Sequence, residues 1–316
     1  MNDVLRKLGQ LALVLFLVTL FTALLVSLLP GDPAEVIIPF GDESDREALR
    51  EELNLDDPLP VRYVAWLGDF VTGDMGNYYR QSITEPVADR VTQAAPVSLL
   101  LMLYAQVLAL VIAIPLGVIT AQRAGSFFDK FTNTTAFGVL AIPNFVLALV
   151  LSYVVGVELG WLPPQGYVRF SNDIGNHVRS MILPSVSLAA GQVAVYMRLL
   201  RTDMVATLQE DFILMAKAKG LSNKRVLWRH ALRPSSLTLL TVAGLNVGTL
   251  VGGALIIEII FTLPGMGVLI FQAISERQYV AIQSLVALIA VGYVLVNVAV
   301  DMLYAALDPR IRSARG

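Results

Sequence analysis

The chain has 316 residues, of which 56 % are hydrophobic and only 15 % are charged, and its formal net charge is −2. A soluble protein of this length cannot bury so large an apolar fraction and still present a wetted surface, and the absence of cysteine excludes a disulfide framework and thiolate metal sites. We therefore predict an integral membrane protein, in contact with membrane lipid and without a nucleic-acid partner. No two-residue alternation of lipid-facing strands is visible, so the predicted fold class is all-α.

Six apolar stretches are long enough to cross a membrane, because about 20 helical residues span the hydrocarbon core. They lie at 8–29, 96–121, 131–157, 181–200, 237–261 and 281–304. The first stretch exceeds the apolar part of an ordinary signal peptide and no clean cleavage site follows it, so we interpret it as a retained helix. Pro115, Pro143 and Pro184 predict kinks in the second, third and fourth spans.

Lysine and arginine are distributed unevenly between the two sides of this six-helix topology. The side that holds both termini collects 15 of the 23 basic residues, including all five lysines, and such a bias marks the cytoplasmic side. The expected organisation is an N-terminal membrane helix (1–29), an extracytoplasmic segment (30–95), a core of five membrane helices (96–305) with a cytoplasmic loop (201–233), and a cytoplasmic tail (306–316).

The segment 30–95, which we call the acidic segment, carries 14 acidic residues against five arginines. Ser44 followed by Glu47 forms a capping-box pattern and predicts a helix that ends near Asn54. A second helix is predicted from four apolar residues at helical spacing: Tyr63, Trp66, Leu67 and Phe70. We interpret the segment as a folded, acidic lid. The alternative is a surface that contacts a docking partner or the substrate.

The loop 201–233, which we call the basic loop, is predicted to begin with a helix that breaks near Gln209. Charged residues stand where the helix dipole favours them, acidic ones early and basic ones late: Glu210, Asp211, Lys217 and Lys219. Gly220 suits the left-handed position that follows a helix. The small side chains of Ala216 and Ala218 would let another surface approach the backbone closely.

A further helix is predicted after Gly220, with Ser222 as its cap. Three arginines recur along it at intervals of four residues: Arg225, Arg229 and Arg233. Pro234 is expected to interrupt this helix. The basic stripe either faces lipid phosphates or belongs to a docking helix for a cytoplasmic partner.

Small and polar residues inside the predicted spans are candidates for packing and transport. Three glycines at intervals of four residues would permit close helix approach, either within the subunit or at a seam with a partner subunit or a pathway wall: Gly244, Gly248 and Gly252. Gln106 and Asn246 are the candidate polar residues of a pathway. A stripe on the last span is assigned to structural hydrogen bonding: Tyr293, Asn297 and Asp301.

Motifs that bind nucleotides or carry out hydrolysis are not found, since the chain has no G-x-x-x-x-G-K-[ST], H-E-x-x-H or G-x-S-x-G. We expect no catalytic residue and no cofactor in this chain. His177 and His230 lie in separate regions, so no metal site is expected. Glu258 and Asp301 lie toward opposite ends of their spans, which argues against an ion-coupled secondary transporter, because such carriers place carboxylates at the midplane.

Two stretches of the basic loop resemble the coupling loop of ABC importer permeases: AKAKGL at 216–221 and RHALR at 229–233. The general motif of that family is E-A-A-x-x-x-G, nine residues, and then I-x-L-P. Ala216, Gly220 and Leu232 match it. Four residues depart from it and look like the variant of peptide permeases: Leu214, Met215, His230 and Arg233.

The resemblance extends along nearly the whole chain. The matching motifs are LLPGDP at 28–33, GDMG at 73–76, IPLG at 114–117, IPNF at 142–145, FTLPGMG at 261–267 and LDPR at 307–310. Each is weak alone, but in their order and spacing they resemble the B-type permease subunit of dipeptide, oligopeptide and nickel ABC importers.

This resemblance implies the type I ABC importer permease fold, with six membrane helices, in a prokaryotic inner membrane. It implies three kinds of partner: a homologous C-type permease, cytoplasmic ATPase subunits that bind ATP and Mg, and an extracytoplasmic binding protein. It also implies a coupling helix from Asp211 to Gly220, with ATPase contacts at Glu210, Asp211, Met215, Ala216, Lys217, Ala218, Lys219 and Gly220. A peptide is the expected substrate, and nickel transport, an ion-coupled carrier and a membrane scaffold are the alternatives.

Overall fold

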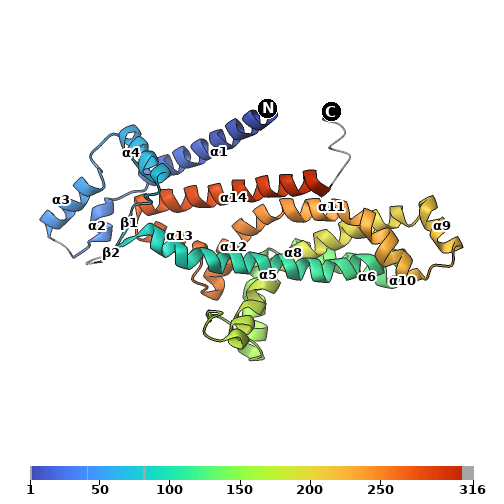
Figure 1. The fold of residues 1–316 in the computed structure, drawn as a ribbon. Helices are drawn as coiled ribbons and strands as arrows, with labels where there is room; N and C mark the ends of the chain where they lie inside the picture. The colour runs from blue at the N-terminus through green and yellow to red at the C-terminus, as the bar shows by residue number, and fades with distance from the viewer. Residues whose placement is uncertain (1, 41, 81–82, 308–316) are drawn as a thin grey trace. The chain divides into compact units, whose positions relative to one another are not determined.

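The computed structural model describes residues 2–40, 42–80 and 83–307, and Figure 1 shows that helices dominate the fold. In chain order the α-helices are α1 (Asn2–Ser27), α2 (Pro33–Ile37), α3 (Glu43–Glu52), α4 (Leu59–Thr72), α5 (Val87–Gln122), α6 (Phe127–Ala141), α7 (Asn144–Leu151), α8 (Ile174–Thr207), α9 (Asp211–Ala218), α10 (Asn223–Arg225), α11 (Leu232–Leu245), α12 (Val247–Phe261), α13 (Met266–Ser275) and α14 (Tyr279–Leu307). Two π-helical stretches, Ser152–Glu158 and Val226–Ala231, continue α7 and join α10 to α11. Strands β1 (Asn77–Arg80) and β2 (Ile83–Pro86) form an antiparallel hairpin. The all-α fold class is confirmed.

Three helices are long and apolar enough to cross a membrane: α5, α8 and the part of α14 up to Val300. Two bent helix pairs pass the same test together. They are α6 with α7 and its π-helical extension, at 98°, and the helix that runs from Asn223 through α11 with α12, at 47°. The described apolar part of α1 is the shorter stretch Leu11–Ser27. These elements match the six predicted spans in place, and the number of spans that cross the membrane stays a prediction.

Proline explains one of the two bends. Pro143 precedes α7 directly, at the 98° break, where its ring fixes the backbone and removes an amide donor. The predicted kinks at Pro115 and Pro184 give no break, because α5 and α8 each run through them as one helix. The second bend falls at Asn246, where the sequence has no proline.

The described residues fall into two compact units. The first comprises the residues up to Ser98 together with Pro264–Leu295, and the second comprises Leu99–Leu263 together with those from Val296 onward. In the first unit, α4 of the acidic segment packs Tyr63 and Trp66 with residues of α1 and α14 in one buried cluster. The Tyr63 hydroxyl lies 2.9 Å from that of Thr19, and Trp66 Nε1 donates to Ser284 Oγ at 3.0 Å. The acidic segment is therefore folded.

The helix boundaries in the acidic segment differ in one respect from the prediction. The cap position of α3 is Asp42 and not Ser44, so that Ser44 lies inside the first turn. Glu43 and Asp45 share this turn, where the helix dipole favours negative charge. The predicted end near Asn54 is confirmed, since α3 stops at Glu52 and Asn54 adopts a left-handed backbone conformation.

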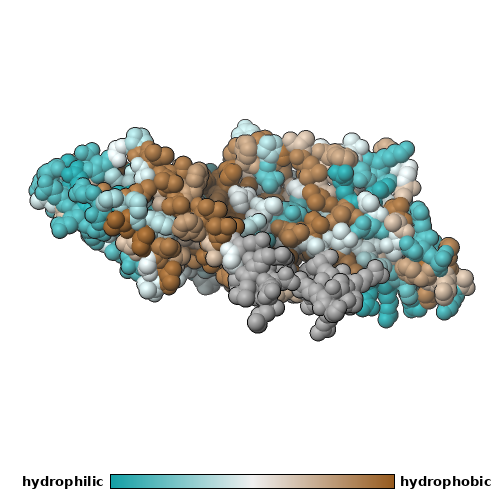
Figure 2. Space-filling view, turned by 90° about the horizontal axis from the view of Figure 1, so that it is seen from above, coloured by the Kyte–Doolittle hydropathy of each residue, from teal (hydrophilic) through white to brown (hydrophobic). Residues whose placement is uncertain are grey.

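The second unit is organised around α8, which contacts α6, α7, α11 and α12. One side of α8 is buried along most of its length, and Tyr196, Leu200 and Met204 are fully covered. Figure 2 shows hydrophilic residues gathered around α2 and α3 in the first unit and around α9 and α10 in the second unit, and each unit also exposes hydrophobic residues. Apolar side chains such as Leu99, Val111 and Leu149 are more than half exposed, as expected for surfaces that meet lipid.

Candidate functional site

The basic loop contains the short helix α9, which has the expected boundaries. Helix α8 ends at Thr207, the chain turns, and α9 begins after Glu210. Asp211 lies in its first turn and Lys217 in its last, as predicted. The break near Gln209 is therefore confirmed.

Gly220 closes α9 with a double hydrogen-bonded turn. Its φ is +74°, its N–H donates to Lys217 O at 2.9 Å, and the N–H of Leu221 donates to Ala216 O at 3.3 Å. This is the Schellman arrangement, which requires the left-handed backbone that glycine adopts without strain. A Cβ at this position would meet nothing within 4 Å. The backbone conformation, and not lack of space, therefore selects glycine.

Helix α9 has a buried side and an exposed side. Ile213 and Ala216 are buried, and α9 contacts the π-helical stretch Val226–Ala231. On the exposed side, Phe212, Leu214 and Met215 are 43 %, 56 % and 56 % exposed. Exposed apolar side chains grouped on one short helix mark a surface for contact with another protein or with a membrane.

Seven of the eight predicted contact residues are exposed, and Ala216 is the exception. At 7 % exposure it packs within the chain and cannot belong to the outer surface. The sequence pattern did not separate it from its neighbours, because the motif marks residue types and not the side of the helix they occupy. Phe212 was missed, although it lies on the same helix as Met215 at a spacing of three residues.

The helix after Gly220 continues further than predicted. The helix following Ser222 passes through the π-helical stretch into α11, which includes Pro234 in its first turn. The prediction that Pro234 interrupts the helix is wrong. The missing N–H of Pro234 falls directly after the π-helical turns, where the regular i→i−4 hydrogen bonding is already interrupted. The wider turns also change the spacing of the arginine stripe.

An ion pair anchors the end of α8 at Arg201, the first residue of the basic loop. The Arg201 guanidinium donates to Asp129 of α6 through Nε, at 2.5 Å, and through Nη2, at 2.6 Å. Asp129 also accepts from the Gly125 N–H and from Asn133 Nδ2, both at 2.8 Å, and its side chain is 4 % exposed. This buried carboxylate is thus fully satisfied. The sequence reasoning missed the pair, since its members are 72 residues apart.

A cluster of uncharged polar side chains surrounds the bend at Asn246. Asn246 Nδ2 donates to Gln192 Oε1 at 3.0 Å, and Gln192 Nε2 donates to Thr249 Oγ1 at 3.1 Å. One turn along α8, the Tyr196 hydroxyl donates to Gln106 Oε1 at 3.2 Å. Both predicted pathway residues, Gln106 and Asn246, therefore contact α8, on neighbouring turns of that helix. We call these five residues the amide cluster.

The three glycines of the predicted series differ in their surroundings. A Cβ at Gly244 would lie 2.6 Å from Val300 Cγ1, so α11 and α14 approach closely there. Gly248 is half-buried, and a Cβ at Gly252 would meet nothing within 4 Å. The 47° bend at Asn246 falls inside the series, so the three glycines do not share one straight helix face.

The other candidate polar residues have structural surroundings or lie outside the description. His177 is fully buried, and its ring nitrogens lie 2.7 Å from Val168 O and 3.1 Å from the Tyr104 hydroxyl. Among the described residues no group of three or more His, Asp or Glu side chains could hold a metal ion. Tyr293 is 46 % exposed. The side chain of Asp301 and nearly all of the predicted tail 306–316 lie outside the described part of the chain.

Comparison with known proteins identifies the class. Residues 113–313 match the family "Binding-protein-dependent transport system inner membrane component", and residues 1–102 match the N-terminal family of the same transport components. The chain therefore belongs to this family, that is, to the permease subunits of ABC importers, multi-pass proteins of the inner membrane that work with ATPase and binding-protein partners.

Two relatives resemble the chain over nearly its whole length. It is 38 % identical to the oligopeptide transport system permease protein AppB of Bacillus subtilis over 93 % of this chain and 94 % of the relative. It is 35 % identical to the probable peptide ABC transporter permease protein y4tP of Sinorhizobium fredii over 98 % of each chain.

Among solved structures, the fold resembles a chain of the MetNI methionine ABC transporter in an inward-facing conformation. The TM-score is 0.57 at 16 % identity, and the match covers 72 % of this chain and 100 % of the other. At that identity the match concerns the fold alone. The predicted type I ABC importer permease fold is confirmed.

Proposed function

We propose that this chain is one of the two permease subunits of an ATP-driven importer of di- or oligopeptides. The relatives named as peptide and oligopeptide permeases support the substrate class, because they match this chain from end to end. A homologous C-type permease forms the other half of the pathway. An extracytoplasmic binding protein delivers the peptide, and partner ATPase subunits bind ATP and Mg.

The exposed side of α9 carries this proposal. Phe212, Leu214 and Met215 form an apolar surface on the basic side of the chain, where the positive-inside rule places the cytoplasm. An amphipathic helix of this kind fits a groove on a partner protein. The exposed charged residues at both ends of α9, including Glu210, Asp211, Lys217 and Lys219, form the rim of the contact.

The packing of α9 suggests how motion passes into the membrane. Ile213 and Ala216 lock α9 to the π-helical stretch that leads without interruption into α11. When the ATPase subunits move together, α9 and the start of α11 move as one piece. The ion pair between Arg201 and Asp129 holds α8 to α6 beside this element, so the displacement is not absorbed locally.

The amide cluster is the part of this proposal that concerns the pathway. Irregular backbone at membrane depth is tolerated where it lines a cavity or is enclosed by protein, and the helix bends by 47° at Asn246, inside a predicted span. Side chains of Asn, Gln, Thr and Tyr offer both donors and acceptors to a peptide main chain without a fixed charge. This suits a pathway for peptides of varied side chains.

The experiment substitutes Met215→Arg in the assembled transporter, with Thr202→Arg as the matched control on an exposed residue of α8. We expect Met215→Arg to weaken co-purification of the ATPase subunits and to lower peptide-stimulated ATP hydrolysis, because it puts a charge into an apolar contact. Thr202→Arg should leave both unchanged.

The lipid-facing alternative predicts the opposite result. There Met215→Arg would strengthen attachment to anionic headgroups and leave ATP hydrolysis at the level of the unmodified protein. Uptake of labelled peptide, compared with uptake of nickel into the same vesicles, tests the substrate class independently of the docking surface.

A further inference from the structure

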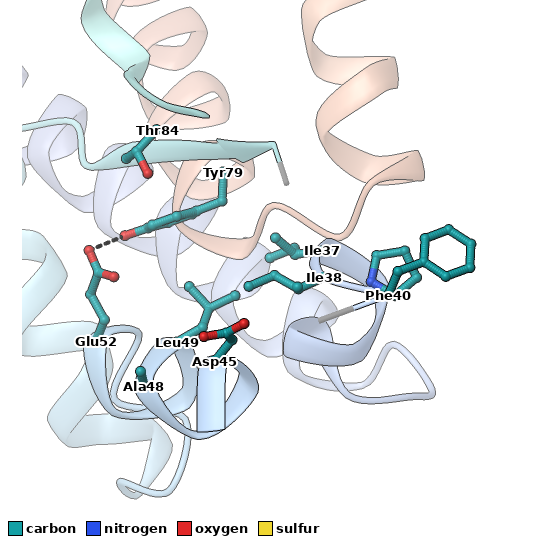
Figure 3. Close-up of a pocket in the computed structure, with 10 residues that line it drawn as sticks. Ile37, Ile38, Phe40, Asp45, Ala48, Leu49, Glu52, Tyr79 and Thr84 are labelled. Atoms are coloured by element: carbon teal, nitrogen blue, oxygen red, sulfur yellow. Dashed lines mark hydrogen bonds between the residues drawn. The ribbon is translucent and has the colours of Figure 1, made fainter. Parts of the chain in front are cut away.

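The acidic segment contains a cavity of about 620 Å³ that the proposed transport cycle does not use. Figure 3 shows its lining, which comes from the end of α2, from α3 and from the hairpin. Ile37 and Leu49 are buried and, with Ile38, form an aliphatic floor. Phe40 belongs to the lining and is 92 % exposed. The volume lies in the range of sites that hold small molecules, about 300–1,000 Å³.

Two carboxylates face this cavity from one side of α3. Asp45 and Glu52 both line it, and Leu49 lies between them. Seven residues are close to two helical turns, so the two carboxylates stand on the same side about 10 Å apart along the axis. A ligand can therefore bind either carboxylate while its apolar part rests on the aliphatic floor.

The cavity is held in shape before any ligand arrives. The Tyr79 hydroxyl donates to Glu52 Oε1 at 2.9 Å, as the dashed line in Figure 3 marks. Arg46 donates from Nε to Ile38 O at 3.2 Å and from Nη2 to Pro39 O at 2.9 Å, which fixes the turn after α2. A preformed site loses less conformational entropy on binding.

The described lining of the cavity contributes two carboxylates. None of its ten described residues is Lys, Arg or His. Arg46 reaches the cavity wall through the main-chain carbonyl groups of Ile38 and Pro39 and also faces Glu43, while Arg50 binds the carboxylates of Glu43 and Asp32. Burial and the hydrogen bond with Glu52 raise the pKa of Tyr79 to about 12, so its hydroxyl stays a donor to this carboxylate.

We propose that this cavity binds the N-terminal residue of a free peptide, with the α-ammonium group on Asp45 or Glu52 and the first side chain on the floor of Ile37, Ile38 and Leu49. An α-ammonium carries its apolar side chain on the adjacent carbon, which matches carboxylates placed beside an aliphatic surface. The inference rests on the proposed function for the substrate class. It assigns to the permease its own peptide site, in addition to the amide cluster.

The test measures peptide binding to the complete transporter in neutral-lipid nanodiscs, without the binding protein. The probes are Leu-Leu-Leu and N-acetyl-Leu-Leu-Leu, and the variants are Asp45→Asn combined with Glu52→Gln, and Ala48→Lys, which brings an ammonium group to the cavity wall. Glu51→Gln, an exposed neighbour on α3 outside the lining, is the matched control.

We expect saturable binding of Leu-Leu-Leu that acetylation and both cavity variants weaken by about tenfold or more. Acetylation and the double variant remove a charge-assisted contact, and Ala48→Lys places a competing ammonium group beside the carboxylates. The control should bind as the unmodified protein does. Equal binding of the acetylated peptide would overturn the proposal. Association with the binding protein is measured in a separate experiment. Variants that still bind Leu-Leu-Leu normally but lose that association would also overturn the proposal, since the cavity would then be a docking surface.

The thermal transition of each variant separates loss of binding from loss of folding, and Ala48→Lys leaves both carboxylates and the bond with Tyr79 in place. ATP-driven uptake of peptide is measured in parallel. Normal uptake without binding at this cavity overturns only the inference, whereas absence of any peptide uptake overturns the proposed function itself.

Discussion

The acidic segment and the basic loop differ in the range of the hydrogen bonds that stabilise them and in the shape of their exposed surfaces. In the acidic segment, side chains are fixed by partners about 200 residues away, as Trp66 is by Ser284 and the main chain of Tyr79 by Gln278. In the basic loop, α9 ends in a backbone turn at Gly220 whose hydrogen bonds span five residues or fewer. The acidic segment has a hollow, preformed cavity, while α9 offers a protruding apolar face.

This difference indicates different occupants. A hollow lined by carboxylates and fixed by long-range contacts suits a small cationic ligand, whereas an exposed helix face suits the groove of another protein. Substitutions should therefore act locally in the basic loop and throughout the first unit when they affect the anchors of the acidic segment.

The largest effect is expected where α8 enters the basic loop. Arg201→Ala leaves the buried carboxylate of Asp129 without its cation, which costs about 3–5 kcal/mol. The thermal transition of the purified protein should fall clearly, whereas the exposed Arg225→Ala should leave it unchanged. Combining Arg201→Ala with Asp129→Ala should restore part of the loss. A double variant no more stable than Arg201→Ala would show that the pair does not interact.

The next effect concerns the anchor of the acidic segment. Gln278 is 2 % exposed, accepts from the Tyr79 N–H at 3.0 Å and donates to Tyr79 O at 2.6 Å. Gln278→Ala leaves both main-chain groups without this partner, at a cost of about 1–3 kcal/mol for each buried group. We expect faster hydrogen exchange at β1 and β2 with unchanged exchange at α9. Exchange that rises equally in both regions would remove the contrast between them.

A smaller change is expected at the end of α9. Gly220→Val forces a β-branched residue into a left-handed conformation, which costs about 1–2 kcal/mol. The end of α9 should tilt and peptide-stimulated ATP hydrolysis should fall, while insertion into the membrane stays normal. Gly68→Val, on the exposed side of α4 where a Cβ would meet nothing within 4 Å, is the control. Full stimulation in Gly220→Val would mean that the geometry of this end does not matter for coupling.

The smallest effect is a change in the alkaline stability of the acidic segment. Because the pKa of Tyr79 is raised to about 12 in the folded protein, the stabilisation it gives is fully present below its ordinary value and is lost as the pH rises through the folded value. Tyr79→Phe should cost about 0.5–1.5 kcal/mol at neutral pH. It should also weaken the pH dependence of the free energy of unfolding between about pH 10 and 12. Unfolding curves of both proteins at these two pH values provide the measurement, and an unchanged pH dependence would contradict the role given to the Tyr79 hydroxyl.

Local patterns predicted much of this structure. Gly220, the break near Gln209 and the helix that ends near Asn54 each depend on a few adjacent residues, and each prediction is confirmed. Gln106 and Asn246 are candidate pathway residues because they are polar residues inside apolar spans. The structure adds their hydrogen-bond partners, Tyr196 and Gln192, which no local sequence pattern indicates.

The failures have a common physical origin in packing that the sequence does not express. Pro234 stays helical because π-helical turns precede it, and Ala216 is buried because a later helix lies against it. The bond from Gln278 to Tyr79 joins residues 199 positions apart, and nothing near either residue signals the other. The cap of α3 is Asp42, two residues before the predicted Ser44.

The ion pair between Asp129 and Arg201 also constrains how these two positions can evolve. Losing Arg201 leaves the buried carboxylate of Asp129 without its cation, whereas two apolar residues of similar volume in place of the pair would be nearly neutral. The ion pair can therefore be lost in evolution only through a destabilising single substitution or through simultaneous substitution of both residues. We expect relatives to keep both residues or to have replaced both, so that the inheritance of position 129 is tied to that of position 201.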